Sequence, residues 1–249
     1  MKRNVIFLIC LIASIVVFGQ NETKHVEVDE VQVTPPKFTG VLNAMALFEA
    51  GKSPINNYLA KNFVCPTETA QCSKEGTEII QFTVTPDGWL TNFKVINSVC
   101  RIVDDEMIRI LKNTNGMWMP GYNNGEPTAM EQEVSLMIGD YSKDKMVNHF
   151  VKQAKKYCRL GNTTLLVEHK PKKALKYYNK GVKYVPSDKS LLSLRGLCHY
   201  ELGDKESARK DWNRITSLGG INPNEIAYEI NEMKGFSEMT EILDNNKKD

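Results

Sequence analysis

The clearest alternation of apolar and polar positions lies in the stretch EIIQFTVT, which begins at residue 78. Ile80, Phe82 and Val84 alternate with polar residues, and this is the period of a strand with one buried face. A PDG turn then leads into LTNFKVINS, where the strand pattern resumes. The pattern therefore predicts a hairpin with one polar face.

Helical spacing flanks this hairpin on both sides. Before it, Ser53 and Pro54 supply an N-cap and a first-turn residue for the short helix PINNYLAKN. After it, the acidic residues 104–106 favour the positive N-terminal end of a helix with an apolar stripe at Met107, Ile110 and Leu111. The run TAMEQEVSLMI, residues 128–138, then predicts a third strand.

The segment between this second helix and the third strand combines turn residues with large apolar ones. Pro120–Gly121 fits the central positions of a type II turn, and Asn124–Gly125 is a second turn signal. Trp118 stands where helix and sheet converge, so we expect it to close the end of a small core rather than to stack on a ligand.

The chain from residue 143 to 235 has helical spacing throughout. Two of its segments align at an offset of 34 residues, so that Ala174 matches Ala208 and Tyr178 matches Trp212. Small residues let paired helices approach, and aromatic residues fill the space between them. The segments KALKYYNKGVKYVP and HYELGDKESARKDWNRI resemble tetratricopeptide repeats, whose period this is. A capping helix, NEIAYEINEM, is expected to follow, with a tail over 236–249. The predicted core residues of the whole chain are Trp118, Phe82, Val84, Ala174, Tyr178, Ala208 and Trp212.

The N-terminus has the layout of a secretory signal peptide. Two basic residues precede an apolar run that ends at Gly19. As a helix this run would reach about 22 Å, short of the roughly 30 Å hydrocarbon core. We therefore expect residues 1–19 to be cleaved and the product to be periplasmic or secreted, with no insertion into a membrane. A retained inner-membrane anchor is the alternative. Residues 20–36 are expected to form an extended leader.

Charge and cysteine content narrow the classes of partner and environment. Cleavage removes Lys2 and Arg3, so the formal net charge falls from +2 to zero, and nucleic-acid binding is not expected. Export permits disulfides, and an odd number of cysteines remains. Cys65 and Cys72 enclose a short polar loop and are the expected pair, with two buried thiols as the alternative. Cys158 and Cys198 are expected to be two buried thiols, with a second disulfide between them as the alternative, and the pairing of Cys100 stays open.

The order of elements over residues 37–140 resembles the C-terminal domain of the energy transducer TonB. The resemblance depends on Gly76, the PDG turn, the acidic helix start, the WMPG segment and Asn124–Gly125. The sequence departs from the family where Cys65 precedes Pro66, in a place that is usually aromatic.

This resemblance implies a binding role for the third strand. In proteins of this family, that strand captures an extended segment of an outer-membrane transporter. The corresponding face here carries Glu131, Glu133, Ser135 and Met137. A sheet of three strands must also leave edges with unpaired N–H and C=O groups, which can accept an added strand. The alternative is an edge protected by its own charges or by neighbouring helices.

Catalytic chemistry has no support in the residue pattern. The four histidines stand in none of the spacings of a hydrolase or a zinc site, and no glycine-rich loop could cradle a phosphate. The acidic residues 104–106 are explained by the positive N-terminal end of a helix. The basic run 170–173 is typical of a solvated helix start, and a site for an acidic partner is the alternative. We therefore expect no catalytic residue, no metal and no cofactor.

The fold class expected is α+β, with a small hairpin, helix and third strand followed by an all-α array. The function expected is that of an exported, non-enzymatic interaction module of the cell envelope, linked to TonB-dependent transport. A genuine energy transducer with a retained N-terminal anchor is the alternative. An envelope hydrolase lacks the necessary residues.

Overall fold

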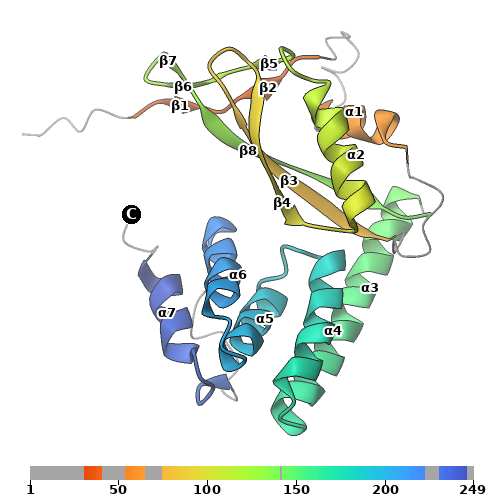
Figure 1. The fold of residues 1–249 in the computed structure, drawn as a ribbon, viewed down its shortest axis with the longest axis vertical. Coiled ribbons are helices and arrows are strands. Elements are labelled where there is room, and N and C mark those ends of the chain that lie inside the picture. Colours follow the sequence, from red (N-terminus) through yellow and green to blue (C-terminus); the bar gives the residue numbers. More distant parts are fainter. Residues whose placement is uncertain (1–30, 41–53, 65–74, 141, 222–229, 246–249) are drawn as a thin grey trace, which may run out of the picture. The chain divides into compact units, whose positions relative to one another are not determined.

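The computed structural model describes residues 31–40, 54–64, 75–140, 142–221 and 230–245. Gln32–Asp249 form one compact unit. Within it, a small antiparallel sheet region is followed by an all-helical region, which confirms the expected α+β class (Figure 1).

Three antiparallel strands form the main sheet, in the order β4-β3-β8. The hairpin and the third strand lie close to where the alternation of residues predicts them. β8 pairs with β3 residue for residue along its whole length, whereas the β3–β4 pairing contains two register shifts. The strands are β3 (Gly76–Val84), β4 (Leu90–Asn97) and β8 (Met130–Ile138).

Two helices bury one face of this sheet. They are α1 (Pro54–Asn62) and α2 (Arg101–Lys112), and their apolar residues share one core with the inward residues of the strands. Phe82 and Val84 lie in this core and are fully buried. Trp118 closes one end of the core. Its ring lies 5.3 Å from the rings of both Phe38 and Phe82, and its Nε1 donates a hydrogen bond to Thr114 Oγ1 at 2.9 Å.

Short strands from the predicted leader and from the predicted turn segment complete the sheet region. Phe38 reaches Trp118 because β2 pairs with β5, and β1 pairs with β6. β1 lies within the leader expected over residues 20–36 and β2 lies at the start of the domain expected over residues 37–140. These strands are β1 (Val33–Thr34), β2 (Lys37–Phe38), β5 (Trp118–Met119), β6 (Gly121–Asn123) and β7 (Glu126–Thr128).

The predicted type II turn at Pro120–Gly121 is wrong. The chain stays extended there and reverses at Asn124–Gly125, where φ is +50° and +83°, as in the two-residue turns that connect hairpins. Gly121 lacks the positive φ that a type II turn needs. Gly121 packs closely against Met130 instead, and an added Cβ at this position would require the methionine side chain to move.

The helical region repeats one packing arrangement. A glycine of the first helix of a pair lies against an aromatic ring of the second: Gly161 against Tyr178, and Gly196 against Trp212. In both pairs an added Cβ would collide with the ring. Ala174, Tyr178, Ala208 and Trp212 are fully buried. The elements are α3 (Lys143–Asn162), the π-helical turn η2 (Thr163–Val167), α4 (Pro171–Tyr184), α5 (Lys189–Glu201) and α6 (Lys205–Ser217).

The C-terminal residues and the cysteines differ in part from the expectations. Phe236–Asn245 form helix α7 instead of a tail, because Met239 and Leu243 supply an apolar stripe that is buried against the helical core. Most of the predicted capping helix lies outside the described residues. Cys158 and Cys198 are both free thiols, and Cys100 is disulfide-bonded. The proposed Cys65–Cys72 pair lies outside the described residues.

Glu78, in β3, has a buried carboxyl group. Its side chain has no exposed surface, its Oε2 accepts the backbone N–H of Val99 at 2.8 Å, and its Oε1 has no partner among the described residues. Burial is the main reason that the pKa of Glu78 rises to about 8, and the negative charge of Asp104 adds to it.

The substitution Trp118→Ala tests the core contact. Loss of the ring and of its hydrogen bond to Thr114 should lower the free energy of unfolding by about 3 to 5 kcal/mol. Urea unfolding of the two chains would measure the difference. Trp89→Ala is the matched control, since Trp89 is 56% exposed and its removal should cost less than about 0.5 kcal/mol. Equal losses in the two variants would contradict the role assigned to Trp118.

The pH dependence of stability tests the buried carboxyl group. The folded-state pKa of Glu78 lies near 8, above its ordinary 4.5, so the folded chain binds more protons than the unfolded chain between these values. The stability that Glu78 contributes is therefore complete below about pH 4.5 and is lost as the pH rises through about 8.

Glu78→Gln should remove this loss, because the amide cannot ionise and still offers an oxygen to Val99. We expect the free energy of unfolding at about pH 8 to rise by about 1 to 3 kcal/mol. Urea unfolding at acidic and at mildly basic pH would measure it, with the exposed Glu126→Gln as control. A variant that loses stability at about pH 8 would contradict the prediction.

Candidate functional site

The outer edge of β8 is the candidate binding edge of the sheet. β8 pairs with β3 along one side, and within the described residues no strand pairs with its other side. The four residues singled out from the sequence alternate along β8 and therefore share one face: Glu131, Glu133, Ser135 and Met137.

Two of these four residues are held by other elements. Gln81 of β3 donates from Nε2 to Glu131 at 3.0 Å. Arg214 of α6 binds Glu133 through both terminal nitrogens, each at 2.6 Å. The structure thus links the predicted face to the helical region, through an arginine that the sequence pattern does not single out. Ser135 is exposed and Met137 is half-buried.

A cavity of about 610 Å³ adjoins this part of β8, and we call it the edge cavity. Ser135 and Met137 line it together with residues of α1 and α3. On α3, Val147 and Val151 lie one helical turn apart and are 42% and 39% exposed. The edge cavity therefore offers an apolar helical surface close to the polar backbone groups of a strand edge.

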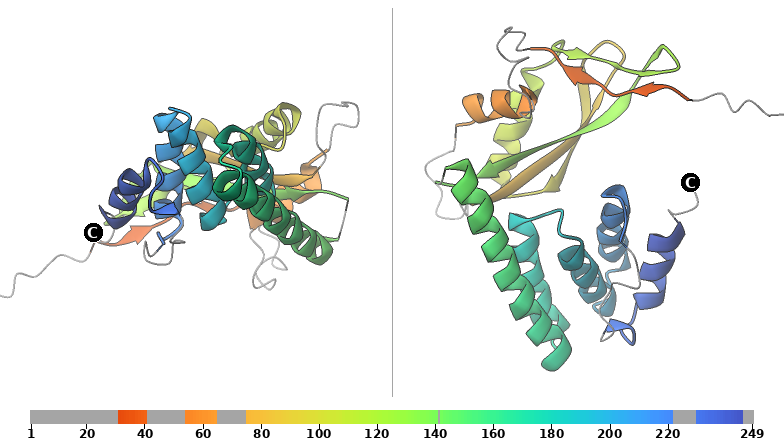
Figure 2. Two further views of the ribbon diagram at one scale, coloured as in Figure 1. Left: turned by 90° about the horizontal axis from the view of Figure 1, so that it is seen from below. Right: turned by 180° about the vertical axis from the view of Figure 1, so that it is seen from behind.

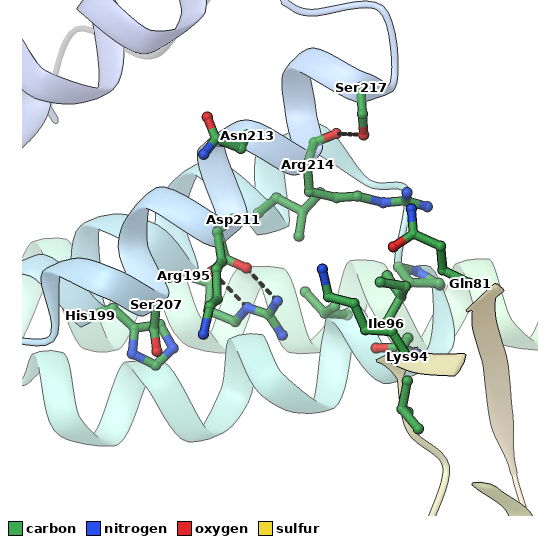
Figure 3. Close-up of a pocket in the computed structure, with 16 residues that line it drawn as sticks. Gln81, Lys94, Ile96, Arg195, His199, Ser207, Asp211, Asn213, Arg214 and Ser217 are labelled. Carbon is green, nitrogen blue, oxygen red and sulfur yellow. Dashed lines mark hydrogen bonds and ion pairs between the residues drawn. The ribbon is translucent and has the colours of Figure 1, made fainter. Parts of the chain in front are cut away.

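A second cavity, of about 540 Å³, lies between β4 and the helices α5 and α6, and we call it the basic cavity (Figure 3). Four basic side chains line it, against the single carboxylate of Asp211. Arg195 of α5 donates from Nε to Asp211 at 2.9 Å. Figure 3 shows Lys94 extending from β4 towards Arg195. The four basic residues are Lys94, Arg195, Lys210 and Arg214.

The two cavities share Arg214 and Pro186. The end of α4 also contacts the sheet nearby, because Thr77 Oγ1 donates to the carbonyl oxygen of Tyr184 at 2.8 Å. Asn97 Nδ2 donates to the carbonyl oxygen of Lys183 at 3.4 Å. These contacts join the sheet to the helices beside both cavities.

The histidines in the described residues occupy structural positions. His149 Nε2 lies 3.1 Å from a carboxylate oxygen of Glu75, and His199 Nδ1 lies 3.2 Å from Asp204. His169 has φ +51° and follows the π-helical turn. No group of three or more potential metal ligands occurs in the part of the chain that the structure describes.

The other charged segments considered in the sequence also have local partners. Asp104 accepts a hydrogen bond from Ser98 Oγ at 2.7 Å, and Glu106 pairs with Arg109 at 2.7 Å. The basic run begins α4, where Lys170 and Lys173 both contact Glu168. These contacts agree with helix-start roles for both segments.

Comparison with known proteins finds a similarity over part of the chain. Residues 61–137 match the family model described as the Gram-negative bacterial TonB protein C-terminal. No curated protein and no solved structure matches the chain. Each helix in the described ranges is too short or too polar to cross a membrane. The matched family is not an enzyme family, and its domains mediate protein interactions in the cell envelope. The sheet region is therefore similar to the C-terminal domain of TonB, which suggests a protein-interaction role of this kind.

Proposed function

We propose that the chain is an exported, non-enzymatic interaction module of the cell envelope that is linked to TonB-dependent transport. In this proposal, the outer edge of β8 takes an added strand from an outer-membrane transporter. The observation that carries the proposal is the uninterrupted pairing of β8 with β3, from Met130 to Ile138. A regular strand presents evenly spaced backbone groups on its outer side, as strand addition requires.

The opposite edge of the sheet is less suited to strand addition. β4 has two register shifts against β3, and Asn92 within it has φ +51°. Such irregularities bend a strand and protect its edge from pairing. The comparison of the two edges therefore favours β8.

The edge cavity adds a source of side-chain specificity. A strand added to β8 would direct alternate side chains towards the half-exposed Val147 and Val151 of α3. This apolar surface favours a partner segment with at least one apolar side chain at the matching position.

The helical region serves in this proposal as a short tetratricopeptide array. The repeated contact of Gly161 with Tyr178 and of Gly196 with Trp212 supports this, together with the offset of 34 residues in the sequence. Its role is to position α3 and α6 beside β8, and Arg214 of α6 already binds Glu133 there.

Site-specific photocrosslinking in intact envelopes tests the proposed edge. A photoreactive amino acid at Ser135 should label an extended segment of an outer-membrane transporter, identified by mass spectrometry of the crosslinked peptides. The same amino acid at Thr91, which is exposed on β4, is the matched control and should not label that segment. Equal labelling from Thr91, or labelling only of enzymes that process small molecules, would overturn the proposal.

Mass spectrometry of the mature N-terminus tests export separately. We expect a chain that begins at Gln20, because the apolar run before it is short for a membrane span. A mature chain that retains residues 1–19 would favour the energy-transducer alternative.

A further inference from the structure

The basic cavity has no part in strand addition at β8, although it is a distinct cavity of about 540 Å³. Its basic side chains come from three elements: Lys94 from β4, Arg195 from α5, and Lys210 and Arg214 from α6. Asp211 is the one carboxylate among the lining residues. The residues that line the cavity therefore carry more positive than negative formal charge, and this excess requires an explanation.

The ion pairs of the lining account for only part of this surplus. Arg195 is paired with Asp211 within the cavity. Arg214 is paired with Glu133 of β8, which does not line this cavity. Lys210 contacts Glu206, but both side chains are largely exposed, at 71% and 81%. Such a pair contributes little and exchanges readily with other partners.

Two donors remain without a partner among the described residues. Lys94 has no ion pair there, and the Nε of Arg214 is buried with no acceptor. A buried N–H without an acceptor is costly, and native structures rarely retain one. Carboxylate oxygens match the planar N–H groups of arginine and the charge of lysine, so they are the acceptors that suit this lining.

We propose that the basic cavity binds a carboxylate-rich segment of a partner protein. The positive charge extends beyond the cavity, since Lys94 and Lys210 are exposed at its border. A segment with several carboxylates can contact these two lysines and the arginines of the cavity together. This site goes beyond the proposed function, because it uses β4, α5 and α6 and does not require the outer edge of β8.

Recognition at this site is by side chains and not by backbone pairing. The register shifts of β4 and the left-handed Asn92 disrupt the regular row of backbone groups that an added strand would need. The two edges of one sheet therefore bind in different ways. One offers hydrogen bonds to a backbone, and the other offers charges to carboxylates.

Fluorescence anisotropy with labelled hexaglutamate, with the full chain as the binding protein, tests the proposal. We expect binding at low ionic strength that weakens as salt is added. Labelled hexaglutamine, which has the same length but no charge, should not bind. Lys94→Glu should weaken the binding of hexaglutamate by at least about tenfold, because it replaces an attractive charge with a repulsive one.

Lys152→Glu is the matched control, because it makes the same charge change at an exposed residue of α3 that lines neither cavity. Its affinity should stay within about twofold of the original. Circular dichroism would show that both variants are folded, and Lys94→Gln provides a milder second variant that should also weaken binding.

Three results would overturn the proposal. The first is no binding of hexaglutamate by the folded chain. The second is an equal loss of affinity in Lys94→Glu and Lys152→Glu, which would indicate attraction by net charge alone. The third is full competition by free glutamate at the same residue concentration, which would identify a site for a small anion. Loss of crosslinking at Ser135 would not affect this test, so the two proposals can fail separately.

Discussion

The contact between the sheet and the helices depends on the hydrogen bonds made by the last carbonyl groups of α4. A helix leaves its last carbonyl groups without partners inside the helix. Here Thr77 of β3 and Asn97 of β4 donate to the carbonyl oxygens of Tyr184 and Lys183. The sheet thus supplies hydrogen bonds that α4 cannot make for itself. Because these bonds involve backbone atoms of α4, they place the helix end as well as its side chains.

This attachment places different chemistry at the two edges of the sheet. Beside β8 it brings the apolar side of α3, where Val147 and Val151 are half-exposed. Beside β4 it brings the basic residues of α5 and α6. The two edge strands also differ in their pairing with β3, since β8 pairs without a register shift and β4 has two. Neither cavity belongs to the sheet or to the helices alone, so each depends on the contact between them.

Local patterns are sufficient to predict most of the elements but not the contacts between them. Alternation at Ile80, Phe82 and Val84 predicts β3 because a strand with one buried face must alternate. The matched positions Tyr178 and Trp212 predict two helix pairs because each must fill the same space. The short strands β1 and β2 are not predictable in this way. A strand of two residues carries no period, and the pairing partners of β1 and β2 lie 80 or more residues away.

The sequence likewise predicts one part of the candidate site and not the other. The free edge of β8 follows from a three-stranded sheet and a family resemblance, and both can be obtained from the sequence. The contact of Arg214 with Glu133 cannot, because the two residues are 81 positions apart and no pattern in the sequence pairs one with the other. Gly121 is an instructive error. The sequence pattern assigns it to a turn, whereas in the structure it lies in the extended strand β6 and packs against the side chain of Met130, the first residue of β8.

Of the two residues that the cavities share, Arg214 and Pro186, only Arg214 carries a charge. It lines both of them, and its terminal nitrogens hold Glu133 on β8 while its Nε has no acceptor among the described residues. A guanidinium group is rigid and planar, so its five N–H groups move together. A ligand that reorients this group from one cavity must therefore change the hydrogen bonds that it makes in the other. Arg214 is thus one physical link between the strand edge and the basic surface, and it belongs to the helical region that follows the TonB-like sheet.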